Sequence, residues 1–222
     1  MLMLARTSLL RILRADTSIL FVGANTGVVS SNAVSVSLTS FTSGPAETGD
    51  LVIAWLATSS PFMPNTPGYE ALSAAAGGTR LGVYFKVMGS TPDVNVTWNP
   101  IPTNTGAVAG VVAFRNTASG AVAVETTGSS TNPDPPSISP NSDGSAIVII
   151  GGTDGLQGAP IPPASYTLAG NDTSNLTNDA SGFAAYRLGL AKDTTENPGA
   201  FTNVSTSSWR AVTVAISPDA PK

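Results

Sequence analysis

The segment GTRLGVYFKVMGSTPD (residues 78–93) is echoed later in the chain by SGFAAYRLGLAKDTT (residues 181–195). Each segment has a run that alternates around one tyrosine, Tyr84 or Tyr186, together with a basic residue and a polar turn. Alternation with a period of two is typical of a strand that buries one face. The echo indicates that the chain contains two related β units.

Other features recur in the same order in the two parts of the chain. The spacings within the pairs differ by only a few residues, which is what insertions into loops would produce. A β-rich, glycine-rich sequence can show such echoes without duplication, but the recurrence of these features in one order favours a duplication. The spaced pairs are Gly49 and Gly144, Tyr69 and Tyr166, Tyr84 and Tyr186, and Val112 and Val214.

Each unit supplies about four strands and one apolar face that needs a partner sheet. Two such units that face each other would bury both apolar faces. We therefore predict an all-β, jelly-roll-like β-sandwich built from two sequence-related halves, with an internal pseudo-twofold axis. The alternative is a pair of separate small sandwiches.

A proline-rich stretch without alternation separates the two units, and this composition is typical of an extended surface linker. The only helix-like stretch, SLLRILRA, lies near the N-terminus and is too short to be stable alone. The predicted organisation is an N-terminal arm (1–18) and a single sandwich (19–222), whose repeats (45–127 and 144–218) are joined by a connector (128–143).

Composition limits the chemistry of the chain. It has no cysteine, which excludes disulfides and thiolate metal sites, and no histidine, the commonest general base and metal ligand. The net charge is −4, although the first 14 positions contain three of the ten basic residues. The rest of the chain is therefore more acidic still, which argues against a nucleic-acid partner.

The sequence carries no nucleophile motif or phosphate-binding loop, and most of its carboxylates stand in turn-like contexts. A pair of carboxylates could in principle hydrolyse glycans. Because most of the carboxylates stand in turns, however, hydrogen bonds to the nearby backbone are the favoured role. The loop GNDTSNLTND (170–179) offers oxygen ligands without the spacing of an EF-hand. We expect no catalytic residues, no cofactor and no metal site.

Two groups of residues are candidates for contacts with other molecules. Trp98 precedes an Asn-Pro turn and could stack on a sugar, although a packing role is favoured. Leucines and arginines cluster in the predicted arm, where they could contact another subunit. The arm residues are Arg6, Leu9, Leu10, Arg11, Leu13 and Arg14.

Five segments of the chain together carry a resemblance to a known family: GDLVIAWLA, PGYEALS, GTRLGVYFKVMGSTPD, AGVVAFRN and NPDPPSISP. In these segments the chain resembles the small duplicated β-sandwich virion proteins of tailed bacteriophages and prophages. The resemblance spans about residues 45–218 and departs from the family pattern at Asn116, where a glycine is typical.

The resemblance implies a non-enzymatic structural protein of the virion, assembled in the bacterial host cytoplasm. We expect a homo-oligomeric capsid decoration or head-surface protein that is attached to other virion proteins through its N-terminal region. The alternative is a tail-fibre or spike component that binds host-surface glycan. No apolar stretch is long enough to span a membrane.

Overall fold

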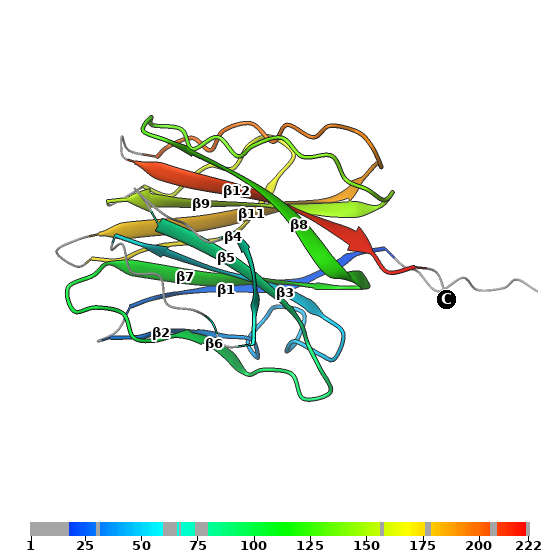
Figure 1. Cartoon of the computed structure of the whole chain (residues 1–222), viewed down its shortest axis with the longest axis horizontal. Helices are drawn as coiled ribbons and strands as arrows, with labels where there is room; N and C mark the ends of the chain where they lie inside the picture. Colours follow the sequence, from blue (N-terminus) through cyan, green and yellow to red (C-terminus); the bar gives the residue numbers. More distant parts are fainter. Residues whose placement is uncertain are drawn as a thin grey trace, which may run out of the picture.

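The computed structural model describes residues 18–29, 32–59, 66, 68–73, 80–155, 158–175, 179–204 and 208–220. All regular secondary structure in these residues is β-strand (Figure 1). No helix long and apolar enough to cross a membrane occurs in them. The strands are β1 (Leu20–Val28), β2 (Val34–Ser37), β3 (Leu51–Thr58), β4 (Glu70–Ser73), β5 (Arg80–Val87), β6 (Asn95–Trp98), β7 (Ala107–Arg115), β8 (Thr117–Gly128), β9 (Ser145–Asp154), β10 (Thr167–Thr173), β11 (Ala180–Leu190) and β12 (Trp209–Pro218).

Two antiparallel five-stranded sheets face each other in the molecule (Figure 1). The first sheet has the order β1-β7-β3-β5-β4, and the second has the order β8-β12-β9-β11-β10. The orders become identical when β1, β3, β4, β5 and β7 are matched in turn with β8, β9, β10, β11 and β12. This match confirms the predicted all-β sandwich of two similar halves.

The stacking of the sheets shows how the halves are related. Strand β1 lies against β10 at one side of the sandwich, and β4 lies against β8 at the other. Exchanging the two halves exchanges these two contacts, as an internal twofold axis requires. Each half alone would leave its inner apolar face in water, so the two sheets stabilise each other.

The strand pairing corrects one of the predicted equivalences. Ile53 pairs with Phe85 and Val112 in the first sheet, whereas Val148 pairs with Tyr186 and Val214 in the second. Tyr186 therefore corresponds to Phe85, and the match with Tyr84 was wrong by one residue. A shift of one residue moves a strand side chain to the opposite face.

The boundary between the halves lies at Asn116, between β7 and β8. Strand β8, which the sequence assigned to the end of the first repeat, pairs with β12 in the second sheet. It is the first strand of the second half, as β1 is of the first half. The change of sheet follows from Asn116, which has a φ of 60° and turns the chain sharply after β7.

The space between the sheets is filled mainly by aliphatic side chains around Trp55, which is 1% exposed. The indole of Trp55 lies against Gly110 of its own sheet and Gly182 of the opposite sheet, and an added Cβ at either glycine would collide with it. The two glycines thus make room for the largest side chain in the core.

The outer face of the first sheet is covered by the two-stranded sheet β2-β6, which forms a third layer in Figure 1. In the second half this layer is reduced to single bridges, Ile138 with Glu196 and Ile161 with Thr202. The proline-rich connector contributes Ile138, which is 8% exposed. This segment is therefore a packed cover of the second sheet and not a free surface linker.

Candidate functional site

The predicted contact residues of the N-terminal arm lie outside the described residues, which begin at Ser18. Their proposed role stays a prediction. The structure does show the junction between the arm and the body, at Ser18. This junction is the candidate site, because the sequence predicts that the arm contacts other subunits. The residues concerned are Arg6, Leu9, Leu10, Arg11, Leu13 and Arg14.

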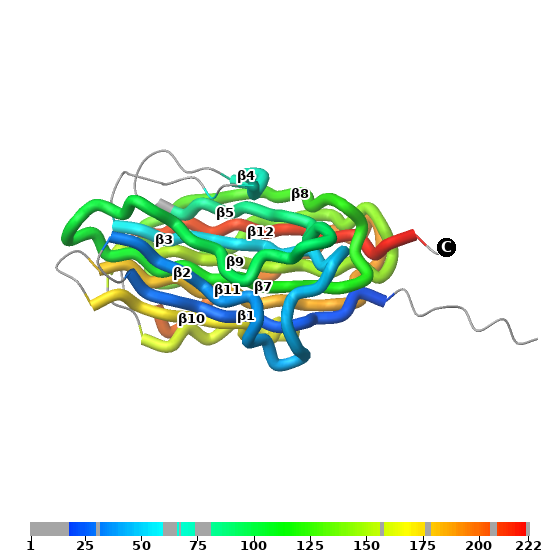
Figure 2. Tube along the Cα trace, turned by 90° about the horizontal axis from the view of Figure 1, so that it is seen from below, coloured from blue at the N-terminus to red at the C-terminus, as the bar shows by residue number. Residues whose placement is uncertain are grey.

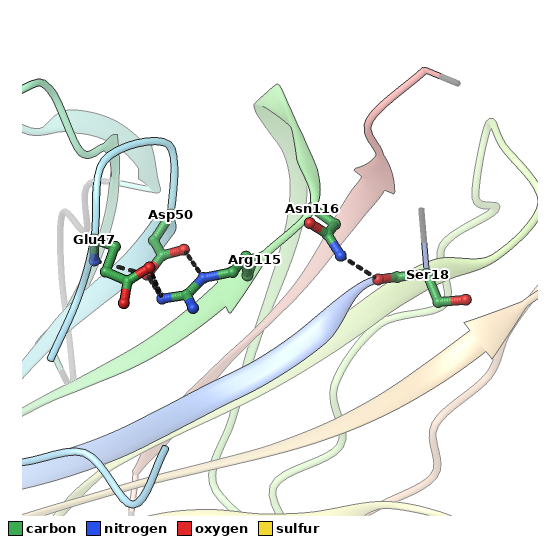
Figure 3. Close-up of polar contacts among 5 residues, drawn as sticks. All are labelled: Ser18, Glu47, Asp50, Arg115 and Asn116. Carbon is green, nitrogen blue, oxygen red and sulfur yellow. Dashed lines mark hydrogen bonds and ion pairs between the residues drawn. The ribbon is translucent and has the colours of Figure 1, made fainter. Parts of the chain in front are cut away.

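Asn116 holds both ends of the described chain together. Its side-chain amide Nδ2 donates a hydrogen bond of 3.1 Å to the carbonyl oxygen of Ser18 (Figure 3). Its own carbonyl oxygen accepts a hydrogen bond of 2.9 Å from the backbone N–H of Asp219. The start of β1 and the end of β12 consequently lie at the same end of the molecule (Figure 2).

An ion pair lies next to this junction. Arg115 donates from Nε to Asp50 Oδ1 at 2.8 Å and from Nη2 to Asp50 Oδ2 at 2.9 Å (Figure 3). The Asp50 side chain is 1% exposed, and it also accepts a hydrogen bond from the backbone N–H of Glu47 at 2.8 Å. Arg115 also pairs with the Glu47 carboxylate at 3.1 Å.

The ion pair ties the start of β3 to the end of β7. The hydrogen bond to Asp50 is the main reason why the pKa of Arg115 lies above its usual value. The corresponding positions of the second half are Ser145 and Ser217, so the pair is specific to the first half. It therefore stiffens the sheet from which the N-terminal arm departs.

A hollow of about 390 Å³ lies beside the junction. Its lining is partly apolar, with Leu188 38% exposed, and it includes the carboxylate residue Asp143. Such a lining offers apolar contact and one negative charge to a neighbouring chain. The lining residues are Ser18, Ile19, Asp143, Gly144, Leu188, Gly189 and Pro218.

Trp98 is not available to a sugar. It is 0% exposed and, with Val34, its partner in the ladder, packs between the two-stranded sheet and the first sheet. The favoured packing role describes Trp98 correctly, and the alternative role in glycan stacking is wrong for this conformation. The sequence left both roles open because Trp98 ends a strand whose cover comes from residues far away in the chain.

A tyrosine, a cation and a carboxylate lie together in the second half. The Tyr166 hydroxyl donates to Glu196 Oε1 at 3.1 Å, and Arg187 Nη1 donates to the same oxygen at 2.7 Å. The Glu196 side chain is 14% exposed, and its backbone bridges to Ile138 of the connector. The triad therefore fastens the cover to the second sheet.

The same three kinds of side chain recur in the first half. Lys86 Nζ pairs with Asp93 Oδ2 at 2.7 Å and lies 5.4 Å from the centre of the Tyr69 ring. Burial first, and then the neighbouring carboxylate, raise the pKa of Tyr69 and of Tyr166. Both phenols therefore keep their protons further into the alkaline range than an exposed tyrosine does.

The carboxylates of the described residues form no group of three or more that could hold a metal ion. In the segment 170–179, of which residues 176–178 are not described, Asp172 lies in strand β10 and not in a loop. It accepts hydrogen bonds from Thr26 at 3.3 Å and from the N–H of Thr173 at 2.9 Å. This carboxylate therefore fixes the local backbone and links the two sheets.

Sequence reasoning missed the Asp50–Arg115 pair, although a signal for it was present. Asp50 stands in the Gly-Asp-Leu element of the resemblance and Arg115 in its Ala-Phe-Arg element. Both elements are the ends of neighbouring strands, so they meet once β3 pairs with β7. Pairing between distant strands was needed to bring the two charges together.

Comparison with known proteins adds no relative to this description. No protein-family model matches the chain, and no curated protein or solved structure matches it significantly.

Proposed function

We propose that this chain is a non-enzymatic structural protein of a bacteriophage virion. Within that class it acts as a capsid decoration or head-surface protein attached through its N-terminal region. The virion assignment itself rests on the resemblance of the quoted segments. The observation that supports a scaffold role is the junction at Ser18, where the basic arm joins the sandwich. This end of the sandwich is held by the hydrogen bond from Asn116 to Ser18 and by the ion pair of Arg115 with Asp50.

The geometry of the body suits a scaffold. Two sheets pack face to face, and further chain segments cover the outer face of the first sheet and part of that of the second. The charged groups nearest the covers are engaged in ion pairs such as Lys86 with Asp93 and Arg187 with Glu196. A body of this kind presents docking positions that many copies can repeat over a symmetric shell, where weak contacts add together.

The arm supplies positive charge for attachment to acidic groups on other virion proteins. Arg6, Arg11 and Arg14 give it a positive charge on an otherwise acidic chain. Its leucines supply apolar area that a partner would bury, since a segment of this length gains little from helix formation alone. The alternative of a glycan-binding fibre has less support, because Trp98, the proposed stacking residue, is buried.

The arm deletion tests this proposal. A protein that lacks residues 1–16 should keep its melting temperature but fail to incorporate into particles assembled in the host. Replacing Arg6, Arg11 and Arg14 together by Gln should weaken incorporation, whereas replacement by Lys should preserve most of it. Full occupancy of the deletion protein would show that the arm is not the anchor.

Two other outcomes would overturn the wider proposal. If the full-length protein is absent from particles purified by density gradient, it is not a virion component. If the deletion unfolds the body, the arm leucines belong to the core and not to a contact with other virion proteins.

A further inference from the structure

The two halves differ in how the outer faces of their first strands, β1 and β8, are covered. In the first half, the outer face of β1 is covered. On the outer side of β1, Gly23 packs so closely on Phe41 that it has no room for a side chain. Asn25 donates from Nδ2 to the carbonyl oxygen of Ser37 in β2 at 2.8 Å. The outer face of β1 is therefore closed by the chain itself.

The corresponding positions of β8 are open. Gly23 pairs with Ala113 and corresponds to Val122, which pairs with Ala215; by the same register, Asn25 corresponds to Val124. Val122 is 58% exposed and Val124 is 36% exposed. The second half thus shows two apolar side chains where the first half has a cover.

The edge of β8 is also less protected than the other three sheet edges. Strand β4 is only four residues long, and β1, β4 and β10 each carry an irregularity within their pairing. Strand β8 also shifts register once, near its start between Thr117 and Ala121, but it has 12 residues, pairs regularly from Ala121 to Gly128, and contains neither proline nor lysine. Long, regular edges without such residues are templates for pairing with another strand.

The charge of β8 does not oppose the approach of a like chain. Its single ionisable residue, Glu125, accepts a hydrogen bond from Arg210 Nη2 at 2.8 Å and another from the Ser73 hydroxyl. The strip from Thr117 to Gly128 is otherwise uncharged on an acidic molecule. A second copy can therefore meet this strip without bringing unpaired like charges together, whereas a charged partner would find no complement on it.

We propose that β8 is an interface between two copies of this chain, paired antiparallel through their β8 edges. In the register centred on Ala123, Val122 lies opposite the partner's Val124, and Ser119 lies opposite the partner's Thr127. The strand is self-complementary in this register, with valines at its centre and small or hydroxyl side chains at its ends. The two second sheets then form one continuous sheet.

The hollow beside β8 fits this interface. It has a volume of about 440 Å³ and lies between β8 and the connector residues Ser139 and Asn141. Val122 is part of its wall. The partner's outward-facing side chains would enter this space, as Phe41 and the β2 segment cover the equivalent face of β1.

Sedimentation velocity of the purified full-length chain tests the interface in the absence of particles. The wild-type protein should dimerise reversibly, and Val122→Lys should raise the dimer dissociation constant at least about tenfold. Val94→Lys is the matched control, because Val94 is 61% exposed and lies outside β8. A monomeric wild type at all concentrations, or a dimer that Val122→Lys leaves unchanged, would overturn the proposal.

The absence of native cysteine permits a test of the register. Opposite residues of antiparallel strands have Cα separations of about 4.5–5.5 Å, within the range of a disulfide. A mixture of Val122→Cys and Val124→Cys chains should therefore form a cross-linked dimer on oxidation, and Val94→Cys chains should not. Equal cross-linking of the Val94→Cys control, or none in the mixture, would refute the pairing.

Because these measurements use the isolated protein, their outcome is independent of the virion proposal. Loss of the dimer on deleting residues 1–16 alone, with Val122→Lys silent, would assign the contact to the arm and refute the β8 interface.

Discussion

At the scale of single residues, the Asp50 carboxylate is a costly group to leave unpaired. Its side chain is 1% exposed, and both of its oxygens accept from the Arg115 guanidinium. Arg115→Met should therefore lower the free energy of unfolding by about 3 kcal/mol, because the buried carboxylate loses its charge partner. Urea denaturation at neutral pH measures this change.

The exposed pair of Lys192 and Asp193 provides the control for that substitution. Their closest atoms are 3.9 Å apart, and their side chains are 55% and 79% exposed. Lys192→Met should cost less than about 1 kcal/mol. Equal effects of the two substitutions would show that burial does not set the strength of the Asp50 pair.

The buried tyrosines give the stability a dependence on pH at the alkaline end. Burial first, then the nearby Glu196 carboxylate, raise the pKa of Tyr166 above that of an unfolded tyrosine, which is about 10. Above pH 10 the unfolded chain loses this proton while the native protein keeps it, so stability falls as the pH rises. Below pH 10 the contribution is fully present.

Tyr166→Phe should therefore make the alkaline loss of stability shallower, by up to about 1.4 kcal/mol per pH unit. Urea midpoints measured between pH 9 and about 11 would reveal it. Tyr69→Phe should act in the same direction, and the two effects should add because the triads belong to different halves of the molecule. An unchanged slope in both variants would contradict the assigned causes.

At the scale of elements, the proline-rich connector behaves as part of the second sheet's cover. The Thr213 hydroxyl donates to the carbonyl oxygen of Pro136 at 2.6 Å, and the backbones of Ile138 and Glu196 exchange two hydrogen bonds. Ile138 itself is 8% exposed. A segment with these contacts cannot be replaced by a flexible linker without uncovering the sheet.

Ile138→Ala should lower the free energy of unfolding by about 2–3 kcal/mol, since it removes buried methyl groups and leaves a cavity. Ile161→Ala is the matched control, because Ile161 also forms a single bridge but is 56% exposed. Its loss should change stability by less than about 1 kcal/mol. Similar losses in both variants would restore the interpretation of the connector as a plain linker.

The element scale also shows where a pattern in the sequence misleads. The segments around Tyr84 and Tyr186 have similar sequences. Tyr84 nevertheless lies on the outer side of its strand, and Tyr186 lies on the inner side. The stacking of Tyr186 on Phe21, with ring centres 4.2 Å apart, requires the inner side. Alternation identifies a strand but does not say which of its two faces is buried.

At the scale of the whole molecule, the two halves share one core. Residues of both sheets surround Trp55, and Thr26 of β1 donates to Asp172 of β10 at 3.3 Å. Neither half, expressed as residues 18–116 or 117–220, should fold alone, because its inner apolar face would be exposed. The two fragments expressed together should form the sandwich by complementation.

Circular dichroism and the solubility of each fragment, alone and together, measure this expectation. A stable, cooperatively unfolding single half would contradict it and would favour two independent small sandwiches. Restoration of a cooperative transition only on mixing would support the shared core.

The sequence by itself determined the all-β class and the duplication, because alternation, turn residues and repeated features are local properties of a strand. It also identified most of the paired positions, such as Tyr69 with Tyr166. Only the tertiary structure decided that β8 opens the second half, that Trp98 is buried, and that Asp50 meets Arg115. Each of these depends on pairing and covering between segments far apart in the chain, which local patterns do not specify.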